Sequence, residues 1–109
     1  MGDLILSSYE DYTRLFDALS HPMRIKIIGI LATKRRYVSE LAKLVNISRP
    51  LLYMHLKKLE DSKVVVGSYE ISDLGKSMKF YEVKDFAICL TPEFLVELAR
   101  GIPVAVGKV

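Results

Sequence analysis

Two helical patterns joined by a short turn, within residues 38–62, restrict the possible folds of this chain more than any other feature. The first pattern covers residues 38–45 and repeats apolar side chains at the spacing of one helix face. We expect its Leu41, Leu44 and Val45 to face the interior. The pattern therefore predicts a short amphipathic helix of about two turns.

The second pattern predicts a longer helix over residues 49–62. Ser48 is a suitable N-cap, and Pro50 lies in the first turn, where its missing N–H has little effect. Apolar side chains then recur at i, i+4 and i+7, as expected of a helix with one buried face. These positions are Leu52, Leu56 and Leu59. A short helix, a tight turn and a longer helix form the helix-turn-helix arrangement.

Further helices are predicted on both sides of this pair. Residues 8–20 form an amphipathic pattern, and Ser8 is its expected N-cap. Its apolar stripe contains Tyr9, Tyr12, Leu15, Phe16 and Leu19. Residues 22–32 are apolar enough to be the central core helix. A last helix is predicted over residues 91–100, with Thr91 as its N-cap.

Beyond the helix-turn-helix pair the period changes from helical to extended. Residues 64–71 and 78–83 are rich in β-branched and aromatic side chains and flank a polar loop that contains Gly75, which is a hairpin signal. We expect a wing over residues 63–84 and a loose tail over residues 102–109. The element order predicts a mainly α fold with a small antiparallel β-hairpin, a winged helix-turn-helix.

Length and composition limit the classes of protein to which this chain can belong. The chain has 109 residues, half of them apolar, and we expect residues 1–109 to form one domain. It has a single cysteine, Cys89, and opens without a charged and apolar leader, so we expect a cytoplasmic protein without disulfides. No apolar run is long enough to cross a bilayer, so we expect no membrane partner.

The formal net charge of +3 is distributed unevenly along the chain. Residues 34–63 contain eight basic side chains against three acidic ones, while both ends of the chain are mildly acidic. A basic segment in an otherwise balanced chain is typical of a protein that binds nucleic-acid phosphates. A solvated basic surface without a partner explains the same charges, and charge alone does not decide between the two.

The outward face of the second helix suits double-stranded DNA. Arg49, at its leading edge, can reach the O6 and N7 atoms of a guanine or a phosphate. Ser48 and the N–H groups of the helix start suit a backbone phosphate. Tyr53 offers a hydroxyl group, and Met54 an apolar contact such as a thymine methyl. Each position alone also fits an ordinary exposed residue, and their grouping on one face favours DNA.

Lysines extend this expected surface. Lys57 and Lys58, one turn further along the helix, suit phosphates. Lys76 and Lys79 in the wing suit a flanking minor groove, or they serve as solubilising charges on an edge strand. The predicted DNA contacts are Ser48, Arg49, Tyr53, Met54, Lys57, Lys58, Lys76 and Lys79.

Two motifs carry a resemblance to a known family. Residues 19–24 (LSHPMR) are similar to an L-x-x-P-x-R motif that opens a second helix, and residues 47–60 (ISRPLLYMHLKKLE) to a recognition helix that ends in H-L-x-x-L. With the hairpin after them, residues from about 12 to 82 resemble the ArsR-type winged helix-turn-helix regulators, especially the short archaeal members. The resemblance implies a homodimer, built largely from the first and last helices, that represses or activates a promoter with an inverted repeat.

The same resemblance does not extend to metal sensing. Metal-sensing members carry a cysteine cluster on the helix that matches residues 40–45, or His and Asp ligands on the last helix, and this chain has neither. One cysteine and two distant histidines cannot converge on a soft metal, so we expect no metal and no cofactor. His55 matches the family's recurrent histidine, with an expected structural role, and His21 is expected at a helix start. Lys63 stands where the family usually has glycine, which a left-handed backbone favours.

Geometry also favours a dimer. One short recognition helix reads few base pairs, and specific sites usually contain two half-sites about one helical turn apart. The first and last helices are more apolar than a small domain needs, and we predict that they share an interface, although the same residues can instead complete the monomer core. The residues are Tyr9, Tyr12, Phe16, Phe94, Leu95 and Leu98. Cys89 lies in the apolar run 86–90, where a buried, inert thiol is expected rather than a redox switch.

Two other functional classes compete with DNA binding. Winged helices also serve as protein-docking modules; the basic recognition helix argues against this, and negligible DNA affinity at physiological salt would argue for it. An enzyme is not expected, because the chain has no glycine-rich phosphate loop, no paired nucleophile and base, and no metal-ligand spacing. We therefore predict no catalytic residue. The operator, the sign of regulation and any small-molecule effector are not encoded in these patterns.

Overall fold

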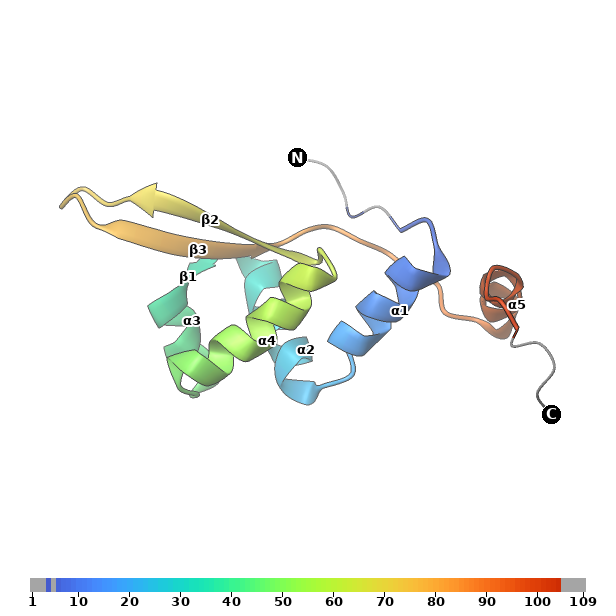
Figure 1. Ribbon diagram of the computed structural model, residues 1–109. Helices are drawn as coiled ribbons and strands as arrows, with labels where there is room; N and C mark the ends of the chain where they lie inside the picture. The colour runs from blue at the N-terminus through green and yellow to red at the C-terminus, as the bar shows by residue number, and fades with distance from the viewer. Residues whose placement is uncertain (1–3, 5, 105–109) are drawn as a thin grey trace.

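The computed structural model describes residue 4 and residues 6–104, and these contain five helices and three strands. The elements, in chain order, are α1 (Tyr9–Ala18), α2 (Pro22–Thr33), β1 (Arg36–Tyr37), α3 (Val38–Val45), α4 (Arg49–Asp61), β2 (Val65–Ile71), β3 (Ser77–Val83) and α5 (Pro92–Arg100). All five predicted helices and the hairpin are present, and β1 is an addition (Figure 1). The winged helix-turn-helix prediction is confirmed. Of the predicted loose tail, residues 102–104 lie outside helices and strands, and 105–109 lie outside the described residues.

Side-chain caps fix the starts of three helices where the sequence predicts them. Ser8 Oγ accepts a hydrogen bond of 3.3 Å from the Asp11 N–H, and the Asp11 carboxylate accepts one from the Ser8 N–H in return. At the starts of α4 and α5, Ser48 Oγ accepts the Leu51 N–H and Thr91 Oγ1 accepts the Phe94 N–H. Each cap satisfies a backbone donor that the first helical turn leaves free.

The hairpin belongs to a three-stranded antiparallel sheet with the order β1-β3-β2. β2 and β3 pair along their whole length, and the short β1 pairs through Arg36 with Tyr81 and through Tyr37 with Phe80. Gly75, in the turn at the tip, has a φ angle of +79°, a conformation that glycine adopts without steric strain. β1 therefore attaches the base of the wing to the segment that leads into α3.

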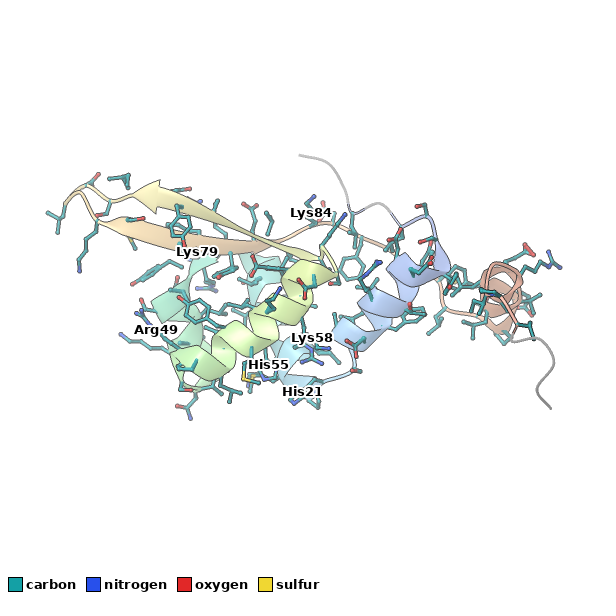
Figure 2. The ribbon with its side chains drawn as sticks, in the orientation of Figure 1. His21, Arg49, His55, Lys58, Lys79 and Lys84 are labelled. Carbon is teal, nitrogen blue, oxygen red and sulfur yellow. The ribbon has the colours of Figure 1, made fainter. Side chains whose placement is uncertain are left out.

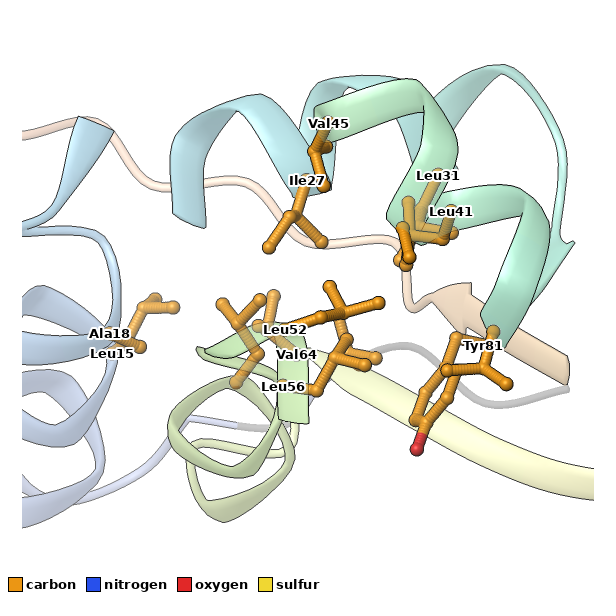
Figure 3. Packing of buried hydrophobic residues seen from close by; sticks show 14 residues of the cluster. Leu15, Ala18, Ile27, Leu31, Leu41, Val45, Leu52, Leu56, Val64 and Tyr81 are labelled. Carbon is orange, nitrogen blue, oxygen red and sulfur yellow. The ribbon is translucent and has the colours of Figure 1, made fainter. Parts of the chain in front are cut away.

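The core lies where α4 crosses the other helices and the base of the sheet (Figure 3). Leu52, Leu56 and Leu59 of α4 are fully buried, as their spacing predicts. They are packed with Leu15 of α1 and Ile27 of α2 in one continuous cluster. The orientation of α4 is therefore set by its buried face, which leaves its opposite face in solvent.

The prediction that Leu44 faces the interior is wrong. Its side chain is 47% exposed, while Leu41 and Val45 are buried. At 100° per residue, the buried arc of α3 runs through Val38, Leu41, Ala42 and Val45, and Leu44 lies outside its edge. Val38 and Ala42, which the sequence analysis did not assign, move the centre of the apolar face away from Leu44.

α5 lies apart from this core, at the end of an extended segment over residues 84–91 (Figure 1). None of its residues is buried. The radius of gyration is 17.0 Å, whereas a compact chain of this length has about 13 Å. Among the described residues, no helix is both long enough and apolar enough to cross a bilayer.

Candidate nucleic-acid interface

The outward face of α4 is exposed to solvent. Arg49, Pro50, Tyr53, Met54 and Lys57 all lie in solvent, with Met54 67% and Tyr53 43% exposed. A shallow hollow on this face is lined by Pro50, Tyr53, Met54, Lys57, Lys58 and Asp61. No acidic residue occurs between Arg49 and Leu59, so the first three turns of α4 present only neutral and basic groups.

The start of α4 offers fewer free donors than the sequence suggests. Ser48 Oγ accepts a hydrogen bond of 3.4 Å from the Leu51 N–H, and Pro50 has no N–H. The Arg49 N–H and the Ser48 hydroxyl proton remain for a phosphate. The tight turn before them uses Asn46 in a left-handed conformation (φ 56°) and a hydrogen bond from the Ile47 N–H to the Ala42 carbonyl.

A buried contact attaches the middle of α4 to α1 and α2. Arg24 donates from Nε to the Ala18 carbonyl at 2.7 Å, and its NH1 lies 3.2 Å from Nδ1 of His55. His55 is 7% exposed and its ring lies 4.7 Å from that of His21, whose Nδ1 accepts the Met23 N–H (Figure 2). The structure thus gives His55 a packing and hydrogen-bonding position and places His21 at the N-cap of α2. Arg24 belongs to the LSHPMR motif, but its link to His55 is a tertiary contact that the motif alone does not predict.

This cluster predicts a loss of stability in acid. Burial lowers the pKa of His55, and the neighbouring His21 and Arg24 lower it further. In the unfolded chain a histidine takes up its proton near pH 6.5, so acidification below that pH favours unfolding until the lower folded pKa is passed. We expect denaturant titrations between pH 7.5 and 5 to show the free energy of unfolding falling by up to about 1.4 kcal/mol per pH unit from this one proton.

The variant His55→Gln isolates the effect. It should lose most of the pH dependence in this window, whatever its absolute stability. His21→Asn keeps a capping side chain on an exposed position and should retain most of it, because burial lowers the pKa of His55 more than His21 does. Equal pH dependence in the wild type and His55→Gln would show that another group titrates.

The two lysines at the end of α4 have carboxylate partners. Lys57 Nζ lies 3.1 Å from Asp61 Oδ1, and Lys58 Nζ lies 2.9 Å from Asp17 Oδ2 of α1. The hydrogen bond from Lys58 and then its charge hold the pKa of the Asp17 carboxyl below its usual value. Exposed ion pairs of this kind are weak, so a phosphate can replace either carboxylate. Lys58 lies on the α1 side of the helix, at the margin of the face that Arg49 and Lys57 share (Figure 2).

The wing is braced from its outer face by residues that the sequence analysis missed. Arg35 donates both guanidinium ends to the Glu70 carboxylate, and its guanidinium carbon lies 4.2 Å from the centroid of the Phe80 ring. The Phe80 ring in turn contacts Tyr37 of β1. A bidentate pair stacked on an aromatic ring restricts the motion of both strands. Arg35 and Glu70 are 35 residues apart and Phe80 lies further along the chain, so the local sequence contains no signal for these contacts.

The two wing lysines occupy different positions. Lys76 is exposed in the turn at the tip, where its N–H donates to Ser72 Oγ. Lys79 is paired with Tyr69 in the ladder, is partly buried, and directs its ammonium group toward the rings of Tyr69 and Tyr81. Lys79 therefore does not share the tip with Lys76, because its side chain lies against the sheet on the side of α4.

The structure connects some of the predicted interface residues within one chain. The ring of Tyr12 in α1 contacts Phe94 in α5, with centroids 5.0 Å apart, and also faces Phe16 at 6.3 Å. Leu95 is 45% exposed. The expected burial of Cys89 is wrong, because the extended segment that contains it packs only its alternate residues, Phe86 and Ile88, against the core.

Lys63 takes the left-handed conformation that the resemblance suggests for the position after α4, with a φ angle of 66°. Its N–H donates to the Glu60 carbonyl, and the Val64 N–H donates to Leu59, so the chain turns directly from α4 into β2. Among the described residues, no group of three or more His, Cys, Asp or Glu side chains has the arrangement of a metal site.

The chain is similar in sequence to known transcriptional regulators. Residues 21–65 match the family described as bacterial regulatory proteins of the arsR family. An uncharacterized HTH-type transcriptional regulator of Methanocaldococcus jannaschii is 34% identical over 88 residues, which cover 81% of this chain and 92% of that protein.

Solved structures agree with these sequence matches. The crystal structure of the transcriptional repressor BigR from Xylella fastidiosa superposes with a TM-score of 0.59 and 26% identity, over 70% of this chain and 72% of that one. A homodimeric winged helix-turn-helix DNA-binding domain from Mycobacterium bovis has a TM-score of 0.62 at 19% identity, over 84% of this chain and 70% of that one. The second likeness shows the fold alone.

Proposed function

The chain belongs to the ArsR family of transcriptional regulators, and from this premise we propose that it acts as a homodimeric repressor that binds an inverted repeat in duplex DNA without sensing a metal. Proteins of this family are DNA-binding regulators and not enzymes. The observation that carries the proposal is the outward face of α4, which is exposed, basic and free of acidic residues over its first three turns. In a helix-turn-helix protein this is the helix that enters the major groove.

Each residue on the outward face of α4 has a different expected role in DNA recognition. Arg49 has the donor geometry for a guanine edge, and Met54, which is widely exposed, supplies an apolar surface for a thymine methyl. Tyr53 carries a hydroxyl group for a phosphate or a base edge, and Lys57 a charge for a phosphate. Lys58 lies at the margin of this face and Lys76 at the tip of the wing, and both suit backbone phosphates. Ser48 completes the set at the start of the helix.

A homodimer accounts for the position of α5. This helix has no buried residue, and it meets α1 through the Tyr12 and Phe94 rings. An apolar hollow beside it is lined by Phe16, Leu19, Phe86, Ala87, Ile88 and Leu90. A second copy that covers α5 and this hollow would remove the apolar surface from water. The M. bovis domain, which has the same fold, is itself described as homodimeric.

Two observations support repression without a metal: a relative is a repressor, and the chain has few possible metal ligands. The relative from X. fastidiosa is described as a transcriptional repressor, and a dimer bound at a promoter competes with the transcription machinery for the same DNA. His21 and His55 already use Nδ1 for Met23 and Arg24, and the chain has one cysteine. A soft metal needs several converging thiolate or imidazole ligands, so zinc is not expected to change the affinity for DNA.

A salt titration tests DNA binding by α4. Duplexes from the chain's own promoter region and of random sequence are titrated by fluorescence anisotropy between about 50 and 200 mM salt, a range over which phosphate contacts weaken strongly. We expect a steep dependence for the wild type and a preference for the promoter duplex. The variant Arg49→Ala, Lys57→Ala should lower the slope of log K against log salt by up to about 2, because each phosphate contact contributes roughly 0.9.

The control removes the same charge elsewhere. Lys26→Ala, Arg100→Ala eliminates two exposed cations on α2 and α5 and should leave the slope close to that of the wild type. If the wild type binds neither duplex at moderate salt, DNA recognition by α4 is refuted and a protein-docking role becomes the better account. If both double variants lower the slope equally, binding depends on net charge and not on the α4 face.

A further inference from the structure

Gly67 in β2 occupies a place where a side chain would collide. It lies opposite Tyr81 in the ladder, and a Cβ atom added to it would be 2.8 Å from Cε of Lys79 and 3.1 Å from Cε1 of Tyr81. Its φ angle is not in the left-handed region, so the backbone does not require glycine here. A glycine inside a strand often marks the close approach of another group, and in this strand that group is the Lys79 side chain.

The lysine that crosses Gly67 is held between two aromatic rings. Its Nζ lies 5.3 Å from the centroid of Tyr69 and 5.2 Å from that of Tyr81, within the range of cation–π attraction. Tyr81 is fully buried, whereas Tyr69 is 70% exposed. The ammonium group therefore sits at the boundary between the core and the solvent, on the face of the wing that looks toward α4 (Figure 2).

The recognition helix borders the same place. Burial raises the pKa of the Tyr81 phenol, Lys79 opposes that change, and the charges of Glu60 and Tyr53 of α4 add to it. Glu60 also lines a hollow together with Val65 and Gly67 of β2, so the end of α4 lies beside this part of the wing. Burial would lower the pKa of Lys79, but Tyr81, Glu60 and Tyr69 together raise it above its usual value. Lys79 thus keeps its positive charge beside the two tyrosine rings, on the face of the wing that looks toward α4.

We propose that Gly67 is a positioning residue for DNA binding. By leaving room for Lys79 to cross β2, it holds the lysine's ammonium group between the Tyr69 and Tyr81 rings, where the charge neutralises the backbone phosphate between the groove entered by α4 and the groove beside the wing. This inference rests on the proposed function. A free lysine loses side-chain entropy when it binds a phosphate. Here the two tyrosine rings order the side chain before DNA arrives, which reduces that loss. Alanine at position 67 has to displace the flexible end of Lys79 from between the rings.

Four variants in the same salt titration test this arrangement. Lys79→Met keeps the apolar stem and removes the charge, and should lower the salt slope by about 1, the contribution of one phosphate. Lys79→Arg retains the charge and should keep the slope. Gly67→Ala should match Lys79→Met, and Gly67→Ala combined with Lys79→Met should show no further loss. Gly29→Ala is the matched control, since a Cβ there meets nothing within 4 Å.

The outcomes separate this inference from the function on which it rests. If the wild type binds duplex and the α4 double variant weakens it, but Lys79→Met leaves the slope unchanged, Lys79 does not contact a phosphate and the inference fails alone. If Lys79→Met lowers the slope while a folded Gly67→Ala, checked by its circular dichroism and melting temperature, keeps it, Gly67 does not position the lysine. If the wild type does not bind duplex at all, both the function and the inference are overturned.

Discussion

Replacement of Leu95 by aspartate should convert the protein to a monomer and reduce its affinity for an inverted repeat by at least about 100-fold. The side chain is 45% exposed in the single chain, so the substitution should leave the monomer fold intact. In the proposed dimer it would place an unpaired charge in an apolar interface, which is strongly unfavourable. Loss of the second half-site then removes the gain from bivalent binding, which commonly amounts to a factor of 10² to 10⁴.

The same helix provides a matched control for this substitution. Val96 is 54% exposed, and at 100° per residue it points to the side of α5 opposite Phe94 and Leu98. Val96→Asp should therefore remain dimeric in sedimentation equilibrium and bind the repeat as the wild type does. If Leu95→Asp sediments as a dimer, or if both variants become monomers, the interface does not lie on the face that contains Phe94, Leu95 and Leu98.

Replacement of Leu56 by alanine should lower the free energy of unfolding by about 2–5 kcal/mol, which is a large part of the total for a domain of this size. Leu56 is fully buried at the centre of the cluster that joins α4 to the other helices. The loss combines the transfer of buried methyl groups with the cavity that remains. Denaturant titration at one fixed protein concentration measures it, since the stability of a dimer depends on concentration.

Met54 is the matched control for this core substitution. It lies two residues earlier on the same helix and is 67% exposed. Met54→Ala should change the stability by no more than about 0.5 kcal/mol, yet weaken binding to DNA that carries a thymine at the contacted position. Similar destabilisation by Met54→Ala and Leu56→Ala would mean that α4 buries a different face.

The sequence predicted the helix starts and the buried face of α4, because both depend on residues only a few positions apart. The caps Ser8, Ser48 and Thr91 each satisfy a helix start through groups a few residues away, and all three were located from the sequence. The leucine spacing in α4 identified its buried face correctly, since a long helix has a face wide enough to recognise. The outward positions of Arg49, Tyr53, Met54 and Lys57 followed directly from that face.

Features that depend on distant partners were not predictable in this way. The strand β1 has two residues and exists because β3 lies beside it. The pair between Arg35 and Glu70, and the pair between Lys58 and Asp17, join segments that approach each other only in the folded chain. A run of basic residues indicates where charge gathers, but not which cations are already paired.

Residues at the edges of apolar segments were also misplaced. Leu44 and Cys89 have apolar neighbours, and the sequence analysis expected both to be buried. Each lies just outside the buried part of a short element, where one residue changes the face. Gly67 is an isolated glycine in a strand pattern, and such a glycine can be recognised in the sequence. Which group approaches it depends on the folded structure and cannot be predicted from the pattern.

Footprinting of the chain's own promoter region tests most directly whether a homodimer reads an inverted repeat with α4. The account predicts two protected half-sites related by twofold symmetry, with centres about 34–36 Å apart, or a multiple of one helical turn, on the same face of the duplex. Arg49→Ala should weaken protection of both half-sites together. Protection of a single half-site at concentrations where the protein is dimeric, or no protection at all, would contradict the account.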